Sequence, residues 1–275
     1  MIQFQNVSKN YTKQTVVENV SLTIEKGKLT AFIGPNGAGK STLLNIMGRL
    51  IPYDEGEIIV EGKEIRKWQQ NEFAKKVAIL KQTNTMNAQI TVRELLAFGR
   101  FPHVKGRIGP KCQELIRNAL NYLGIEDLEY TYLSDLSGGQ LQRTLIGMVL
   151  CQDAEYILLD EPLNNLDMKY ALQIMKILRN LVDDLGRTVV IVIHDINFAS
   201  AYADNIIALK DGKKFGDASA EQMMRKPIID NLYDMDVEII DYKNRKYCMY
   251  YEENNDELTY KETNLNNKKI LVNNF

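Results

Sequence analysis

The chain contains no run of about 18 apolar residues, which is the length that a membrane-spanning helix requires. Its first residues also lack the basic start and apolar stretch of a signal peptide, so the sequence predicts no secretory leader. We therefore expect a soluble chain that works in the cytoplasm.

Cysteine and histidine are both scarce. Cys112, Cys151 and Cys248 are odd in number and widely spaced, which argues against a disulfide framework or a metal site and favours buried thiols in a reducing compartment. The two histidines, His103 and His194, are too few for a histidine-rich metal centre.

An excess of basic charge is also missing. The 34 Lys and Arg residues against 36 Asp and Glu residues give a net charge of -2. Proteins that bind DNA or RNA usually carry a basic surface, so this balance weakens a role in DNA repair or translation and predicts no nucleic-acid partner. A hydrophobic content of 45% and a charged content of 25% are ordinary for a globular protein.

The apolar pattern predicts an α/β fold. Even-numbered apolar positions predict an N-terminal β region that includes residues 16–24, and continuous apolar runs predict strands of a parallel sheet buried on both faces. From about residue 91 to residue 152 the spacing is helical, which predicts a helical insert in the core. The other predicted strands are 29–33, 58–60, 77–80, 156–159 and 189–193. A helix between the last two of these strands is predicted to stop at Gly186.

The end of the sequence differs from the rest because it is polar and rich in Tyr and Asn. We divide the chain into a domain at 1–230, with a helical subdomain at about 84–155, and a C-terminal extension at 231–275. Alternation in the extension is compatible with a small hairpin, and the last twenty or so residues are expected to be loosely ordered. The hairpin positions are Val237, Ile239, Tyr247, Met249 and Tyr251.

A phosphate-binding loop follows the predicted strand at 29–33. The segment from Gly34 to Ser41 matches G-x-x-x-x-G-K-[ST], with a strand before it and a helix after it. Glycines allow backbone N–H groups to approach phosphate oxygens, and the helix dipole favours the negative charge. Lys40 is expected to bridge the β- and γ-phosphates, and the Ser41 hydroxyl to bind Mg²⁺.

Three polar residues follow two of the predicted buried strands. Asp160 and Glu161 end one strand, and His194 ends the next, so all three are expected at the same edge of the sheet. Asp160 is suited to hold Mg²⁺, and Glu161 to polarise the water that attacks the γ-phosphate. A neutral imidazole at His194 could hydrogen-bond that water or the γ-phosphate.

A second segment has the features of an anion site at a helix start. Leu136 to Gln140 reads Leu-Ser-Gly-Gly-Gln, with a serine positioned to cap a helix and two glycines that expose N–H groups. An ordinary capped helix would have the same local pattern. Two phosphate-binding helix starts in one chain nevertheless suggest a dimer in which each chain contacts the nucleotide of the other.

These motifs together resemble the nucleotide-binding subunits of ABC transporters over about residues 1 to 230. The resemblance assigns the phosphate loop, the Q-loop, the signature, the metal-binding and catalytic carboxylates, the D-loop, the switch histidine and an aromatic residue that stacks on adenine. The phosphate loop consists of Gly34, Pro35, Asn36, Gly37, Ala38, Gly39, Lys40, Ser41 and Thr42, and the Q-loop glutamine is Gln82. The signature consists of Leu136, Ser137, Gly138, Gly139 and Gln140. Asp160 and Glu161 are the metal-binding and catalytic carboxylates, Leu166 and Asp167 end the D-loop, His194 is the switch histidine, and Tyr11 is the residue that stacks on adenine.

The resemblance implies a fold, a reaction and partners. It implies an ABC cassette with a RecA-like mixed sheet, an N-terminal antiparallel β region and a helical subdomain that carries the signature. It also implies an ATPase that uses ATP and Mg²⁺, with Gln82 as a further ligand of the metal and participant in hydrolysis. Two chains would form a head-to-tail homodimer on integral-membrane permease subunits, at the cytoplasmic face of the membrane, and Gln82 to about Thr91 would face the permease.

Two further segments resemble the importers of ferric siderophores, haem and cobalamin. They run from Thr91 to Pro102, which includes Gly99 and Arg100, and from Ile193 to Asp204. The resemblance implies uptake of a ferric siderophore-type chelate, with an extracytoplasmic siderophore-binding protein as an indirect partner. The alternatives left open are an ATPase for another solute, such as haem, cobalamin or an exported substrate, a non-transport ABC ATPase acting on ribosomes or DNA, and a catalytically inactive regulatory subunit.

One motif departs from the family pattern. Leu163, Asn164 and Asn165 replace the expected threonine-containing start of the D-loop, which puts the details of communication between subunits in doubt. The Asn- and Lys-rich tail after about residue 252 is also longer than such subunits need.

Overall fold

Apolar runs form the parallel strands of a six-stranded sheet in a computed structural model that describes residues 1–12, 14–81, 89–104, 108–243 and 245–250. The strand order is β10-β9-β3-β8-β7-β6, and only β10 is antiparallel to its neighbour. The strands are β3 (Leu29–Ile33), β6 (Val77–Leu80), β7 (Tyr156–Asp160), β8 (Thr188–Val192), β9 (Asn205–Lys210) and β10 (Lys213–Ser219). The predicted α/β core is confirmed.

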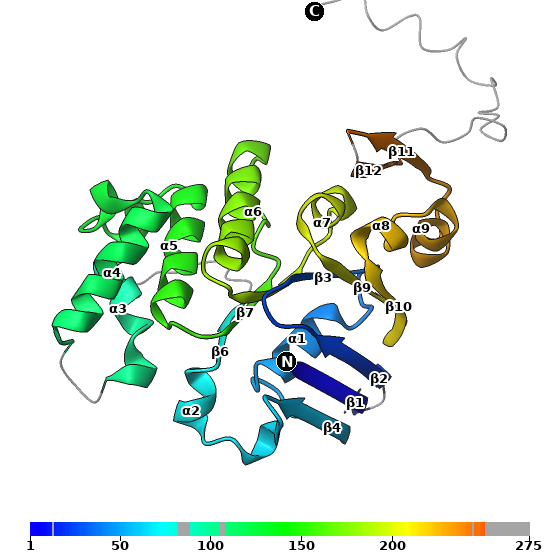
Figure 1. Ribbon diagram of the computed structural model, residues 1–275, viewed down its shortest axis with the longest axis horizontal. Coiled ribbons are helices and arrows are strands. Elements are labelled where there is room, and N and C mark those ends of the chain that lie inside the picture. Colours follow the sequence, from blue (N-terminus) through cyan, green and yellow to red (C-terminus); the bar gives the residue numbers. More distant parts are fainter. Residues whose placement is uncertain (13, 82–88, 105–107, 244, 251–275) are drawn as a thin grey trace, which may run out of the picture.

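A second, antiparallel sheet of order β2-β1-β4-β5 covers one side of the core, with α1 between the two sheets (Figure 1). Its strands and this helix are β1 (Ile2–Tyr11), β2 (Gln14–Ile24), β4 (Glu55–Val60), β5 (Lys63–Glu64) and α1 (Lys40–Met47). The pattern predicted Val16 on the buried face, but the structure buries Val17 and leaves Val16 half-buried. The cause is an irregular register between Val7 and Lys9 of β1, which shifts the alternation in β2.

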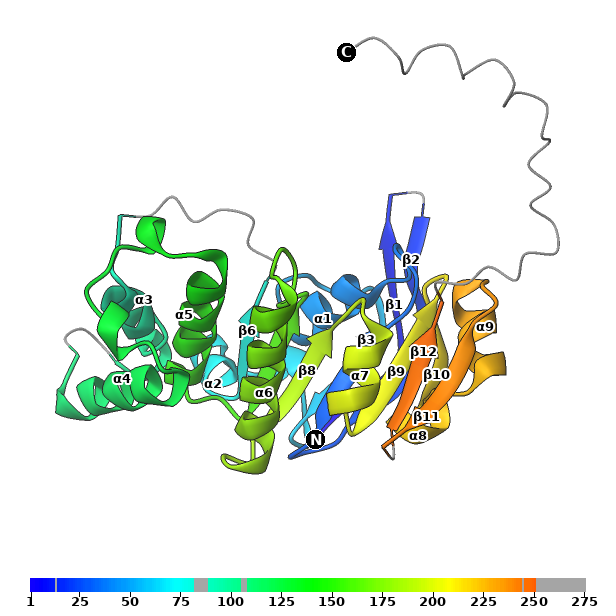
Figure 2. The ribbon, with the colours of Figure 1, turned by 90° about the horizontal axis from the view of Figure 1, so that it is seen from above.

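Helices cover the opposite face of the six-stranded sheet. Figures 1 and 2 show α6 (Met168–Asp183) and α7 (Ile196–Tyr202) along this face. The apolar side of α6 packs into the same core as strands β3, β7 and β8. Because both faces of these strands are covered, their sequences read as continuous apolar runs rather than as alternating patterns.

A cluster of helices stands at one end of the sheet (Figure 2). It contains α3 (Val92–Phe98), α4 (Pro110–Leu123) and α5 (Gly138–Cys151), with the short helix α2 (Gln70–Ala74) near β6. Pro110 is the first residue of α4, a position that proline tolerates because a backbone N–H there would have no helical partner. Residues 105–107 lie outside the described ranges. Single 3₁₀ turns occur at Ile65–Lys67, Phe101–His103, Glu126–Leu128 and Leu133–Asp135.

The chain ends, within the described ranges, in two short helices and a hairpin. These are α8 (Ala220–Met223), α9 (Lys226–Tyr233), β11 (Glu238–Tyr242) and β12 (Arg245–Met249). Helix α9 runs across residue 230, and the division of the chain into 1–230 and 231–275 stays a prediction. The predicted loose order of the tail falls on residues that the structure does not describe. In the described part of the chain, no helix has both the length and the apolar character needed to cross a membrane.

Candidate ATP-binding and hydrolysis site

The predicted phosphate loop connects the end of β3 to the start of α1. Gly34, Gly37 and Gly39 all have positive φ, at 134°, 80° and 94°, a region that L side chains rarely adopt. A Cβ at Gly34 would also lie 2.0 Å from the backbone oxygen of Leu209. The glycines are therefore required by the path of the loop itself, before any ligand is considered.

Lys40 is directed back over this loop. Its side chain is 5% exposed, and its ammonium donates to the backbone oxygens of Gly34 and Pro35 at 2.7 and 2.9 Å. Burial lowers the pKa of Lys40, while the nearby carboxylates of Glu161 and Asp160 act in the opposite direction. These two loop carbonyls are replaceable partners, so the ammonium can exchange them for phosphate oxygens.

Asp160, the last residue of β7, meets the first turn of α1. The Ser41 hydroxyl donates to Asp160 Oδ1 at 2.7 Å, across 119 residues of sequence. Burial raises the pKa of Asp160, a shift that the bond from Ser41 partly opposes. A hydroxyl and a carboxylate are the hard oxygen donors that Mg²⁺ prefers, and Mg²⁺ commonly takes only one or two protein ligands beside phosphate and water. The pair fits such an ion.

Glu161 follows at the same sheet edge, in a left-handed backbone conformation with φ of 51°. Its N–H donates to the Val192 oxygen at 3.2 Å, which fixes the turn against the end of β8. His194 Nε2 lies 2.7 Å from Glu161 Oε1, and Asn164 Nδ2 donates to Glu161 Oε2 at 2.8 Å. A cavity of about 280 Å³ opens beside Glu161, His194 and Asn164.

The signature segment begins α5, as its pattern predicted. The Ser137 hydroxyl accepts from the Gln140 N–H at 3.4 Å, and the Gln140 side chain accepts from the Ser137 N–H at 2.8 Å, which forms a capping box. A Cβ at Gly139 would lie 2.5 Å from the ring of Tyr170, so this position requires a glycine. Figures 1 and 2 place α5 in the helical cluster, apart from α1 and its phosphate loop.

The remaining predicted residues lie as follows. Pro35, Asn36 and Ala38 belong to the loop, Thr42 lies in the first turn of α1, and Gly138 is the first residue of α5. Tyr11 ends β1 with 46% of its surface exposed, and the Lys9 ammonium lies 5.3 Å from its ring centre. Gln82 lies outside the described residues.

Two residues at the site were not among the predicted ones. Asn164 holds the Glu161 carboxylate, and its departure from the family pattern was the only signal that could have drawn attention to it. Tyr233 of α9 accepts a hydrogen bond from the Gly34 N–H at 3.2 Å. Gly34 and Tyr233 are 199 positions apart in the sequence, so no local pattern indicates this contact.

Comparison with known proteins relates the chain to ATP-binding subunits. A family model described as "ABC transporter" matches residues 17–164. The chain is 51% identical over 251 residues to the petrobactin import ATP-binding protein YclP of Bacillus subtilis, covering 91% of this chain and 100% of that protein. It is 43% identical over 240 residues to the petrobactin import ATP-binding protein FatE of Bacillus anthracis, covering 87% and 96%.

A solved structure has the same fold. The structure described as the dimeric form of MJ0796, a bacterial ABC transporter cassette, superposes with a TM-score of 0.71 at 31% identity. The match covers 80% of this chain and 99% of that one. The predicted cassette fold is thereby confirmed, including the antiparallel N-terminal strands and the helical subdomain.

Proposed function

The chain belongs to the ABC transporter family, and on that basis we propose that it is the ATP-hydrolysing subunit of an importer for a ferric siderophore. The cargo is supported by the two relatives, which are both named petrobactin import proteins and which it matches over nearly their whole length. Import rather than export is favoured by the same names. Partners would be integral-membrane permease subunits at the cytoplasmic face and, indirectly, an extracytoplasmic siderophore-binding protein.

The observation that carries the ATPase assignment is the meeting of five polar residues at one sheet edge. Lys40, Ser41, Asp160, Glu161 and His194 come from α1, β7 and the end of β8, and the last four are joined by the bonds Ser41–Asp160 and Glu161–His194. We assign the phosphates of ATP to the loop from Gly34 to Thr42 and the adenine to Tyr11. Ser41 and Asp160, with Gln82 as a further ligand, would hold Mg²⁺, which neutralises charge on the phosphates when it is bound.

Glu161 is the proposed general base. It would accept a proton from the water that attacks the γ-phosphate, and release from one of its two present partners would leave one carboxylate oxygen more open to that water. His194 is the candidate to leave, because its imidazole could bond the γ-phosphate instead of Glu161 Oε1. Asn164 would keep hold of Oε2 and so orient the carboxylate during this exchange.

The signature segment is proposed to act on the ATP of a second copy. Within one chain α5 lies apart from the phosphate loop, so Ser137, Gly138, Gly139 and Gln140 need a partner to reach a nucleotide (Figure 2). The dimeric cassette with the same fold supports this arrangement. ATP would then be held between α1 of one chain and α5 of the other.

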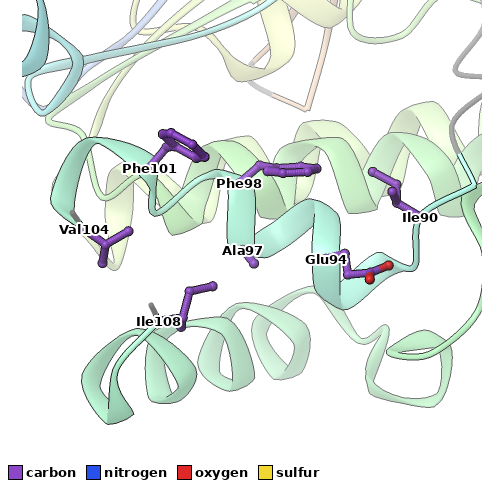
Figure 3. Close-up of a pocket in the computed structure, with 7 residues that line it drawn as sticks. All are labelled: Ile90, Glu94, Ala97, Phe98, Phe101, Val104 and Ile108. Carbon is purple, nitrogen blue, oxygen red and sulfur yellow. The ribbon is translucent and has the colours of Figure 1, made fainter. Parts of the chain in front are cut away.

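A cavity in the helical cluster is the proposed contact with the permease. Its volume is about 380 Å³, and Figure 3 shows two phenylalanine rings at its edge. Phe101 is 72% exposed and Phe98 49%, which is unusual for large apolar side chains unless a partner covers them. The residues that line the cavity are Ile90, Glu94, Ala97, Phe98, Phe101, Val104 and Ile108.

Uptake of radiolabelled ligands in cells carrying Glu161→Gln would test the proposal. Ferric petrobactin, a ferric hydroxamate, haem and cobalamin would be compared in parallel, with Glu114→Gln on the exposed side of α4 as the matched control. We expect uptake of one ferric siderophore to fall by at least about 100-fold, because a general base contributes about that much or more. Normal uptake of all four in a strain without a second ATPase of this type would contradict the assigned cargo.

A further inference from the structure

The region from the start of α9 to Tyr250, which follows β12, covers the described residues 226–243 and 245–250 and has no part in the function proposed so far. We call it the C-terminal element. Helix α9 packs on β9 and strand β12 packs on α7, so the element lies beside the part of the sheet formed by β9 and β10 (Figure 1). Its contacts reach two parts of the ATP site.

The first contact is with the phosphate loop. The Gly34 N–H donates to the Tyr233 hydroxyl at 3.2 Å, at the point where β3 turns into the loop. Burial raises the pKa of Tyr233 to about 12, so the hydroxyl stays neutral near pH 7. Lys210 holds the end of α9 in place by donating to the Asn231 oxygen and to Asp234 Oδ1 at 2.5 and 2.7 Å.

The second contact is with the helix that follows His194. The Asn197 side chain, near the start of α7, makes a pair of bonds with the backbone of Cys248 in β12. Its amide donates to the Cys248 oxygen at 3.1 Å, and its oxygen accepts from the Cys248 N–H at 2.7 Å. The Ser200 hydroxyl adds a bond of 2.7 Å to the Lys246 oxygen. Strand β12 therefore fixes the position of α7.

Both contacts meet around one cavity. It has a volume of about 230 Å³ and is lined by His194 on one side and by Tyr233, Val237 and Cys248 of the C-terminal element on the other. The start of the phosphate loop and the helix that follows His194 are therefore held by the same small unit.

We propose that the C-terminal element positions the ATP site, with Tyr233 fixing the phosphate loop at Gly34 and Asn197 fixing the helix after His194 through Cys248. Neither is a catalytic residue, because each acts through another. Tyr233 keeps the N–H groups of the loop in place for the phosphates, and the bonds of Asn197 keep His194 in register with Glu161. This inference rests on the assignment of the loop to the phosphates of ATP.

Tyr233→Phe removes one oxygen atom and tests the first part of the proposal, that Tyr233 fixes the phosphate loop at Gly34. The matched control is Tyr242→Phe, which removes the same atom from an exposed tyrosine of the same element. In the full chain assembled with its permease, we expect the KM for MgATP to rise about threefold to tenfold with kcat within about twofold, as for loss of one hydrogen bond. Hydrogen exchange at the Gly34 amide should also become faster.

Asn197→Ala tests the second half, with Asn197→Asp as the conservative variant that still accepts from the Cys248 N–H. We expect the alanine variant to lower kcat about threefold to tenfold at unchanged KM, and the aspartate variant to recover part of the loss. Unchanged KM and Gly34 exchange in Tyr233→Phe, or unchanged kcat in Asn197→Ala, would overturn the corresponding half. Wild-type protein that fails to bind ATP would instead overturn the site assignment.

Discussion

The two helix starts assigned to phosphate in this chain, those of α1 and α5, are built differently. Helix α1 begins after Gly39 with no side-chain cap, so its first N–H groups have no side-chain acceptor. Helix α5 begins with a full capping box in which Ser137 and Gln140 satisfy each other's N–H groups. One helix start is open to an anion, whereas the other already has its acceptors.

This difference in capping indicates separate roles for the two helix starts: α1 in binding nucleotide, and α5 in the association of two chains. The start of α1 is flanked by the buried Lys40 ammonium and by the Ser41 hydroxyl, which we assign to Mg²⁺, so we expect it to bind nucleotide within one chain. At α5, the phosphate of ATP in the proposed dimer would compete only with a weak bond, since Ser137 Oγ is 3.4 Å from the Gln140 nitrogen. We therefore infer that α1 sets the affinity for ATP, and that α5 sets how readily two ATP-loaded chains associate.

Lys40→Ala is expected to have the largest effect on this comparison. It removes a buried ammonium that would bond phosphate, and hydrogen bonds to charged groups are worth about 1.5–3 kcal/mol each, or roughly 10- to 100-fold in affinity. Equilibrium binding of a fluorescent ATP analogue to the isolated chain measures the change. Lys111→Ala, on the exposed side of α4, is the control. An affinity that stayed within a factor of two would mean that α1 does not dominate binding.

Ser137→Ala should have a smaller effect, and on association alone. In a Glu161→Gln background, which we expect to keep ATP intact, the chain's own affinity for ATP should change less than about twofold. ATP-dependent dimerisation should weaken about fivefold, from loss of one hydrogen bond from the Ser137 hydroxyl to the phosphate, worth about 1 kcal/mol. Sedimentation velocity over a range of protein concentrations measures dimerisation. Ser134→Ala, which alters a nearby exposed serine outside the helix cap, is the control. Equal losses in affinity and in dimerisation would assign α5 to its own chain's nucleotide.

The same contrast explains what could be predicted from the sequence. Motifs made by neighbouring residues, such as the loop from Gly34 to Ser41 and the cap at Ser137, carry their own geometry and were placed correctly. The meeting of Asp160 and Glu161 with His194 also followed from the sequence, because parallel strands end at one edge of a sheet.

Contacts between distant segments could not be predicted in this way. Tyr233 reaches Gly34 only because α9 packs on β9, and nothing in a tyrosine near a chain's end indicates its partner. The irregular pairing that buries Val17 in place of Val16 also depends on a neighbouring strand rather than on the local alternation. Such details are fixed by tertiary packing, which overrides local patterns.

Asp160→Asn should have the smallest effect, and one opposite in sign to that of Ser137→Ala. The folded pKa of Asp160 is raised by burial, so folding favours the protonated carboxyl, and the stability of the folded state decreases as pH rises through that pKa. Asparagine has no such penalty and can still accept the bond from Ser41.

Without nucleotide at pH 7, we expect Asp160→Asn to raise the melting temperature by a few degrees and Ser137→Ala to lower it. The gain should disappear below the carboxyl's ordinary pKa, because the wild-type side chain is then neutral as well. Melting curves recorded from about pH 3 to pH 8 on the wild type and both variants would check the two signs. A gain that did not depend on pH would mean that packing, rather than the buried charge, makes the α1 side of the site unstable.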